Sequence, residues 1–125
     1  MSELQVKGLI PGAIEDLLVI GSTEWTTVEN VYQLLDQIQP CRVVSGPRVG
    51  AEHSARKWAA VNRVPFSYSR ALGPHWSPTM ALALATARDA WIRNEVVRLR
   101  GLCIPVVMFN AMVGGTFARL VGLWI

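Results

Sequence analysis

Three short loops, rich in glycine and hydroxyl side chains, each follow an apolar run and precede a helical pattern. They read GSTEWTT (residues 21–27), SGPRVGA (residues 45–51) and NAMVGGT (residues 110–116). Backbone N–H groups at such a helix start lie at the positive end of the helix dipole and can bind an anion. Together the three loops would form a continuous floor for a phosphate-bearing ligand. Taken singly, a glycine after a strand more often reflects turn geometry alone.

Two arginines are the candidate anion contacts. Arg48 lies within the second loop, and Arg93, next to Asn94, lies within AWIRNEVVRL. A guanidinium group suits phosphate better than an ammonium group does, although a helical arginine is also consistent with a solvated face. The predicted ligand-binding residues are Gly21, Ser22, Thr23, Gly46, Arg48, Gly50, Arg93, Asn94, Gly114, Gly115 and Thr116. None of the loops matches a Walker A or a Gly-x-Gly-x-x-Gly pattern.

Hydrolysis of an N-glycosidic bond needs a carboxylate near the oxocarbenium-like transition state. The acidic residues near the loops or near Arg93 are Glu24, Glu52, Asp89 and Glu95, of which Glu24 and Glu95 are the better acid–base candidates. We predict no metal site, because the two histidines are isolated from each other and from any ligand cluster. We also predict no catalytic residue and no cofactor. Cys41 and Cys103 each lie in an apolar run, and we expect buried free thiols.

Strands that alternate with helices must position these loops. Apolar runs typical of strands buried on both faces occupy residues 17–20, 42–45, 64–68 and 104–109. Helical patterns occupy residues 27–38, 51–62 and 79–100, and a last short helix is expected from residue 115 or 116 toward residue 122. Ser77 and Pro78 read as the N-cap and first residue of the third helix.

This alternation predicts one α/β, Rossmann-like domain over residues 1–125. We expect an open, mostly parallel sheet of four to five strands with helices on both faces. In such a sheet ligands bind beyond the carboxyl ends of the strands, which is where the three loops would lie.

Composition sets the class of protein. The 125 residues are 51% hydrophobic, with a mean hydropathy of +0.30. No apolar stretch reaches the roughly 18 residues of a spanning helix, and no secretory signal is present, so we expect a cytoplasmic protein without a membrane partner. The net charge is +3, but the arginines are spread along the chain, and nucleic acid is therefore not an expected partner. The apolar surplus favours a homodimer or a higher homo-oligomer.

Four pieces of the sequence resemble the motifs of a known protein family. The pieces VIGSTEW, VVSGPRVGAEHSARKWA, IRNEVV and VVMFNAMVGGT are similar to motifs of the SLOG superfamily, a Rossmann-like group, and in particular of its small YspA-like branch. They come in the family's order and span about residues 17–121. The second piece is the most specific, because its glycines, alanines and Trp58 fall at family positions without a gap, with Glu52 where the family has Asp.

The departures from the pattern bear on function. Thr23 stands where the branch has Arg, Ser45 replaces a His, and Pro47 replaces a Gly. Enzymes of this group that cleave nucleoside monophosphates carry a glutamate after the last glycine loop, where this chain has Ala118 and Arg119. The resemblance therefore implies a nucleotide or nucleotide-derivative binding or sensing protein without catalysis.

Two alternatives stay open. One is a hydrolase of N-glycosidic bonds in nucleoside monophosphates that uses one of the remaining carboxylates. The other is a degenerate member of the fold, at home in phage or mobile-element genomes, that acts as an interaction or inhibitor protein through a protein partner.

Overall fold

A computed structural model of the chain describes residues 10–25, 28–86, 89–111 and 121–124. In chain order the elements are β1 (Asp16–Gly21), α1 (Val28–Ile38), β2 (Arg42–Ser45), α2 (Ala51–Val61), β3 (Phe66–Tyr68), a single 3₁₀ turn η1 (Ser69–Leu72), β4 (Met80–Thr86), α3 (Ala90–Gly101), β5 (Val106–Ala111) and β6 (Val121–Trp124).

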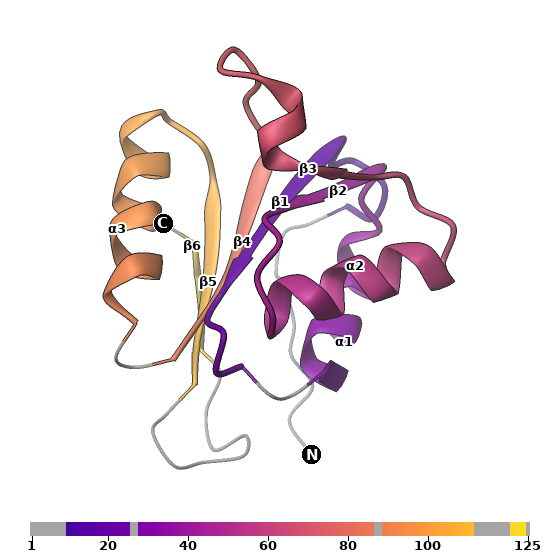
Figure 1. Cartoon of the computed structure of the whole chain (residues 1–125), viewed down its shortest axis with the longest axis horizontal. Coiled ribbons are helices and arrows are strands. Elements are labelled where there is room, and N and C mark those ends of the chain that lie inside the picture. Colours follow the sequence, from indigo (N-terminus) through magenta and orange to yellow (C-terminus); the bar gives the residue numbers. More distant parts are fainter. Residues whose placement is uncertain (1–9, 26–27, 87–88, 112–120, 125) are drawn as a thin grey trace.

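The strands form one sheet in the order β3-β2-β1-β4-β5-β6. The first five run parallel, and β6 pairs antiparallel with β5. Helices α1 and α2 cover one face of the sheet, and α3 covers the other (Figure 1). The predicted α/β, Rossmann-like architecture is therefore confirmed. The described sheet has six strands, however, where four to five were expected.

The additional parallel strand is β4, and it corrects the prediction of one long helix over residues 79–100. The segment MALALAT lies at the centre of the sheet, between β1 and β5. Its alanines, Ala81, Ala83 and Ala85, pack on the α3 side, whereas its larger side chains pack on the other side. Alanine and leucine both favour helices in isolation, but burial on two faces decides the outcome here. The helix itself begins only at Ala90.

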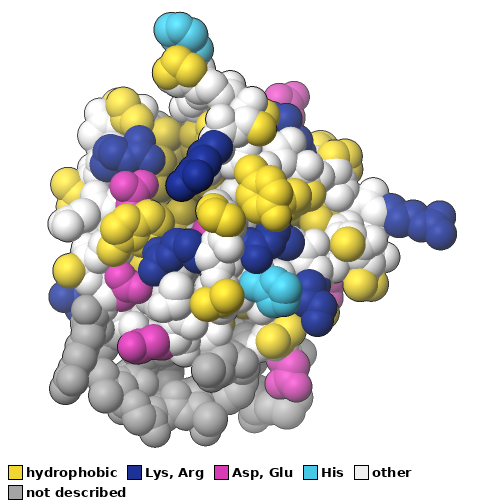
Figure 2. Space-filling view, viewed as in Figure 1, with side chains coloured by type: hydrophobic (Ala, Val, Ile, Leu, Met, Phe, Trp, Pro, Cys, Tyr) yellow, Lys and Arg dark blue, Asp and Glu magenta, His cyan; other side chains and the backbone are white. Residues whose placement is uncertain are grey.

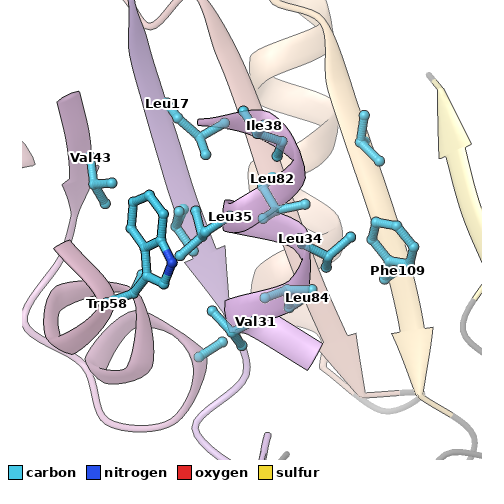
Figure 3. Packing of buried hydrophobic residues seen from close by; sticks show 14 of the residues in the cluster. Leu17, Val31, Leu34, Leu35, Ile38, Val43, Trp58, Leu82, Leu84 and Phe109 are labelled. Atoms are coloured by element: carbon cyan, nitrogen blue, oxygen red, sulfur yellow. The ribbon is translucent and has the colours of Figure 1, made fainter. Parts of the chain in front are cut away.

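Two apolar layers hold the helices to the sheet. Beneath α1 and α2, side chains such as Leu34 and Leu35 pack over Leu17 and Leu82, with Phe109 beside them (Figure 3). All of these side chains are buried. Burial of this kind contributes roughly 25 cal/mol for each Å² of apolar surface. The smaller layer on the α3 side relies on the alanines of β4, which allow the helix a close approach.

A polar clamp closes the amino end of the sheet. The carboxylate of Asp16 on β1 accepts hydrogen bonds from Arg42 of β2 at 2.9 and 2.6 Å, and from the indole nitrogen of Trp76 at 2.9 Å. Trp76 belongs to the crossover from β3 to β4. The hydrogen bonds and charge of Arg42, together with the bond from Trp76, lower the pKa of Asp16 against the opposing effect of burial. The clamp therefore ties together three segments that are distant in sequence.

Two further predictions are corrected. Residues 121–122 belong to β6, so the expected terminal helix does not extend to Gly122, and most of its predicted span lies outside the described residues. Cys41 and Cys103 are exposed rather than buried, because both lie in turns between a helix and a strand. Among the described residues no helix is long and apolar enough to cross a membrane.

Candidate functional site

The candidate site lies at the carboxyl ends of β1 and β4. The chain leaves β1 toward β2 on one side, and it reaches β4 only after the crossover from β3 at the far edge. Such a reversal of strand order is the point at which open α/β sheets bind ligands. Strand β4, which was predicted as helix, brings Thr86 and Asp89 to this edge of the sheet. The contribution of these two residues to the site was therefore missed from the sequence.

Ser22 connects the two strand ends. Its hydroxyl oxygen accepts a hydrogen bond from the backbone N–H of Thr86 at 2.9 Å, and its own N–H donates to Leu84 at 2.9 Å. The same hydroxyl donates to the carboxylate of Asp89. Ser22 is buried, so this network fixes the loop after β1 against the start of α3.

Asp89 is the N-cap of α3. Its side chain accepts a hydrogen bond from the N–H of Ile92 at 3.1 Å, which satisfies one of the open donors at the helix start. Partial burial would raise the pKa of Asp89, but Ser22, the N–H groups of the helix and the charge of Arg48 outweigh it and lower the pKa below its usual value. Asp89 is therefore an anion at neutral pH and not a proton donor.

The loop after β2 surrounds the carboxylate of Glu52. This side chain is only 1% exposed, and burial raises its pKa above the usual value, against the charge of Arg48 and the backbone N–H groups of Gly21, Arg48 and Gly46. A side chain at Gly46 would lie 2.8 Å from the Glu52 carboxylate. The loop that was predicted to hold a phosphate thus directs backbone N–H groups at a carboxyl group of the chain itself.

Gly50, by contrast, is required by backbone conformation. Its φ is +84°, and a Cβ there would lie 2.5 Å from the carbonyl oxygen of Ser22. This close approach joins the loop after β2 to the loop after β1. Gly50 therefore has a structural role in the site.

Arg48 crosses the site from the loop after β2 to α3. Its guanidinium carbon lies 4.1 Å from the ring centroid of Trp91, and its Nη1 lies 3.9 Å from the Glu52 carboxylate. The Arg48 side chain is 28% exposed and Trp91 is 45% exposed, so part of this stacked pair faces solvent. Within the described residues, Arg48 Nη1 and Glu52 Oε2 are buried without a hydrogen bond. The attraction between the guanidinium group and the ring face holds these two side chains together.

Arg56 on α2 is a functional candidate that the sequence did not single out. Its Nη1 donates to the carbonyl oxygens of Gly46 at 2.8 Å and of Arg48 at 3.1 Å, and its Nη2 lies 3.3 Å from Nδ1 of His53. No carboxylate of the described residues forms an ion pair with it. The only sequence signal was an arginine one turn inside the helix that follows a glycine-containing loop.

The structure therefore gathers part of the predicted set. The residues that it brings together at the carboxyl edge are Gly21, Ser22, Gly46, Arg48 and Gly50. Thr23 is exposed beside Gly50, and Arg93 and Asn94 are exposed near the start of α3, four and five residues after the cap. Gly114, Gly115 and Thr116 lie outside the described residues.

The other candidate carboxylates lie away from this network. Glu24 is exposed, and Glu95 forms an ion pair with Arg98 at 2.9 Å along the surface of α3. Across residues 10–25, 28–86, 89–111 and 121–124, no group of three or more histidine, cysteine or acidic side chains has the arrangement of a metal site.

The fold is that of a Rossmann-like α/β domain, and the polar, arginine-containing candidate site lies at its switch point. Family models, curated proteins and solved structures were all compared with the chain, and none of them matches it.

Proposed function

We propose that this protein binds a nucleotide or nucleotide derivative at the carboxyl edge of β1 and β4, and that it senses the ligand without transforming it. The observation that carries the proposal is the stacked pair of Arg48 and Trp91, which lies next to the Ser22 network at the switch point. A nucleotide presents an anionic phosphate and a flat base, and this pair offers a cation and an aromatic face.

The two carboxyl groups at the site, Glu52 and Asp89, support binding over hydrolysis. Glu52 is enclosed by backbone, and Asp89 is engaged as a helix cap with a lowered pKa, so neither is available as an acid to protonate a leaving base. An active hydrolase would release free base from nucleoside monophosphates. We expect none when a nucleoside monophosphate is incubated with stoichiometric protein and the mixture is separated by chromatography.

Membership of the SLOG superfamily is part of the proposal. Its support is that VIGSTEW and VVSGPRVGAEHSARKWA, distant in sequence, meet at one edge of the sheet. The alanines of the second motif, Ala51, Ala55 and Ala59, are all buried against the sheet, as the close packing of such a helix requires.

The test is a thermal melt with a panel of nucleoside phosphates and dinucleotide cofactors. A ligand present at 100 times its Kd stabilises the native state by about 2.7 kcal/mol. We expect a raised Tm with at least one ligand and a smaller rise in Arg48→Ala. Arg100→Ala is the matched control, because Arg100 lies at the far end of α3. No shift with any ligand of the panel would refute the proposed function.

A surface on α3 supports the second candidate, an interaction protein or homo-oligomer. Val97 is 68% exposed in the middle of the helix, and Leu102 is exposed just after its end. If this surface is an interface, light scattering after size-exclusion chromatography gives a mass above 13.8 kDa for the wild type and a lower mass for Val97→Arg. A monomeric wild type would exclude the homo-oligomer.

A further inference from the structure

The site continues beyond Arg48 into a row of four residues, in which two arginines lie between two aromatic residues. Trp91 of α3 contacts Arg48 at 4.1 Å, the carbonyl oxygen of Arg48 accepts a hydrogen bond from Arg56 at 3.1 Å, and Arg56 lies 5.9 Å from the ring centroid of Tyr68 on β3. We call these four residues the arginine–aromatic strip.

The strip lies on an exposed face of the molecule. Tyr68 is 47% exposed, similar to Trp91 at the other end. In Figure 2 hydrophobic side chains and Lys or Arg side chains interleave across the middle of the face, between α3 and α2. Tyr68 stands edge-on to Phe66 at 5.0 Å, so its ring has a fixed orientation. Each end of the strip thus presents an oriented aromatic ring to solvent.

The charge lies between the two rings. Glu52 and Asp89 offset Arg48, whereas Arg56 forms no ion pair with any described carboxylate and donates only to carbonyl oxygens and to His53. An anion would therefore gain most at Arg56, in the centre of the strip. The arginines are scattered along the sequence, but the fold places two of them between two exposed rings.

We infer that the strip binds two nucleobases joined by a phosphodiester. One base stacks at Trp91 and Arg48, the other stacks on Tyr68, and the linking phosphate lies against Arg56. Stacking on aromatic side chains and on guanidinium planes is the usual way in which unpaired bases are held. The inference rests on the proposed function and deepens it, because a mononucleotide would use only one end of the strip. Two kinds of ligand contain two bases joined by a phosphodiester: a free dinucleotide and a segment of single-stranded nucleic acid.

The experiment compares three probes by titration calorimetry: AMP, the linear dinucleotide pApA and a twelve-residue oligo(dA). We expect pApA to bind about tenfold or more tightly than AMP, because it adds one stacked base. Tyr68→Ala should remove this advantage and leave AMP binding unchanged, whereas Tyr68→Phe should retain it. Arg56→Ala should weaken pApA and reduce the slope of log K against log salt by about 1.

The controls separate this inference from the proposed function. Val61→Ala changes an exposed apolar side chain outside the strip and should leave the affinity for all three probes unchanged. Circular dichroism and a thermal melt confirm that each variant is folded. Equal affinity for AMP and pApA, with no effect of Tyr68→Ala, would overturn the inference while the proposed function stands. Absence of binding by all probes and by the nucleotide panel would overturn both. If oligo(dA) binds more tightly than pApA, the ligand is a segment of single-stranded nucleic acid. Equal affinities indicate that the ligand is a free dinucleotide.

Discussion

Glu52 is the residue on which the local structure of the site depends. A buried carboxyl group whose pKa is raised binds its proton more tightly in the folded than in the unfolded state. Its contribution to stability is therefore fully present below the usual value of 4.5 and is lost as the pH rises through the raised pKa.

We expect Glu52→Gln to remove this pH dependence, because the amide does not titrate. Relative to the variant, the wild type should lose stability as the pH rises above about 4.5. Urea denaturation of both proteins at several pH values from 4 to 8 measures the difference. Parallel stability curves for the two proteins would show that Glu52 does not titrate in this range.

This residue also shows what sequence reasoning could and could not reach. The glycine of SGPRVGA at position 46 was predicted to contact a ligand phosphate, and in the structure Gly46 and Gly21 lie against the Glu52 carboxyl group. The loop surrounds a side chain of the protein because Glu52 is deeply buried, and a helical sequence pattern does not show how deeply a side chain is buried. Arg56 was missed for a similar reason, because its role comes from hydrogen bonds to the preceding loop.

At the scale of elements, most of the fold followed from the sequence. The predicted spans of α1, β2 and α2 agree with the structure within one residue, and that of β1 within one residue at each end. The failure at β4 has a specific cause. Its alternation of alanine with larger side chains was a strand signal, but the helix-favouring composition and Ser77-Pro78 outweighed it. A central strand is specified mainly by its neighbours, which are not adjacent in the sequence.

Asp89 caps the start of α3, so its substitution should destabilise this helix. Asp89→Ala should lower the free energy of unfolding by about 1 kcal/mol through loss of the cap. Asp89→Asn should keep most of it, because an asparagine side chain also accepts the hydrogen bond from Ile92. Urea midpoints of the two variants measure the contrast. Equal losses in both would mean that the charge near Arg48, not the cap, is what stabilises the helix start.

At the scale of the whole molecule, the clamp at Asp16 holds β1, β2 and the crossover to β4 together. We expect Asp16→Ala to cost about 2 kcal/mol, typical of hydrogen bonds to a charged group. Trp76→Phe, which removes a single bond, should cost less. Guanidinium unfolding monitored by circular dichroism gives both values, and a neutral Asp16→Ala would show that the clamp is not stabilising.

The loss of stability at acid pH depends in part on the same clamp. The pKa values of Asp16 and Asp89 are lowered in the folded state, so their contributions are present above the usual value of 3.8 and are lost as the pH falls below it. The Asp16→Asn variant lacks the titration of Asp16. Between neutral pH and acid pH it should therefore lose less of its free energy of unfolding than the wild type loses. A fluorescence titration between pH 5 and 2 records it.

The pairing of β1 with β4 also governs how the chain can fold. Asp16 and Thr79, which meet through a hydrogen bond at the start of this pairing, are 63 positions apart. Closing a chain segment of this length costs about 4 kcal/mol of entropy before the contacts inside it can form. The half from β1 to β3, in contrast, is built from neighbouring units. The docking of β4 is thus the step that we expect to limit the folding rate, and Ala83→Gly should slow refolding more than it accelerates unfolding.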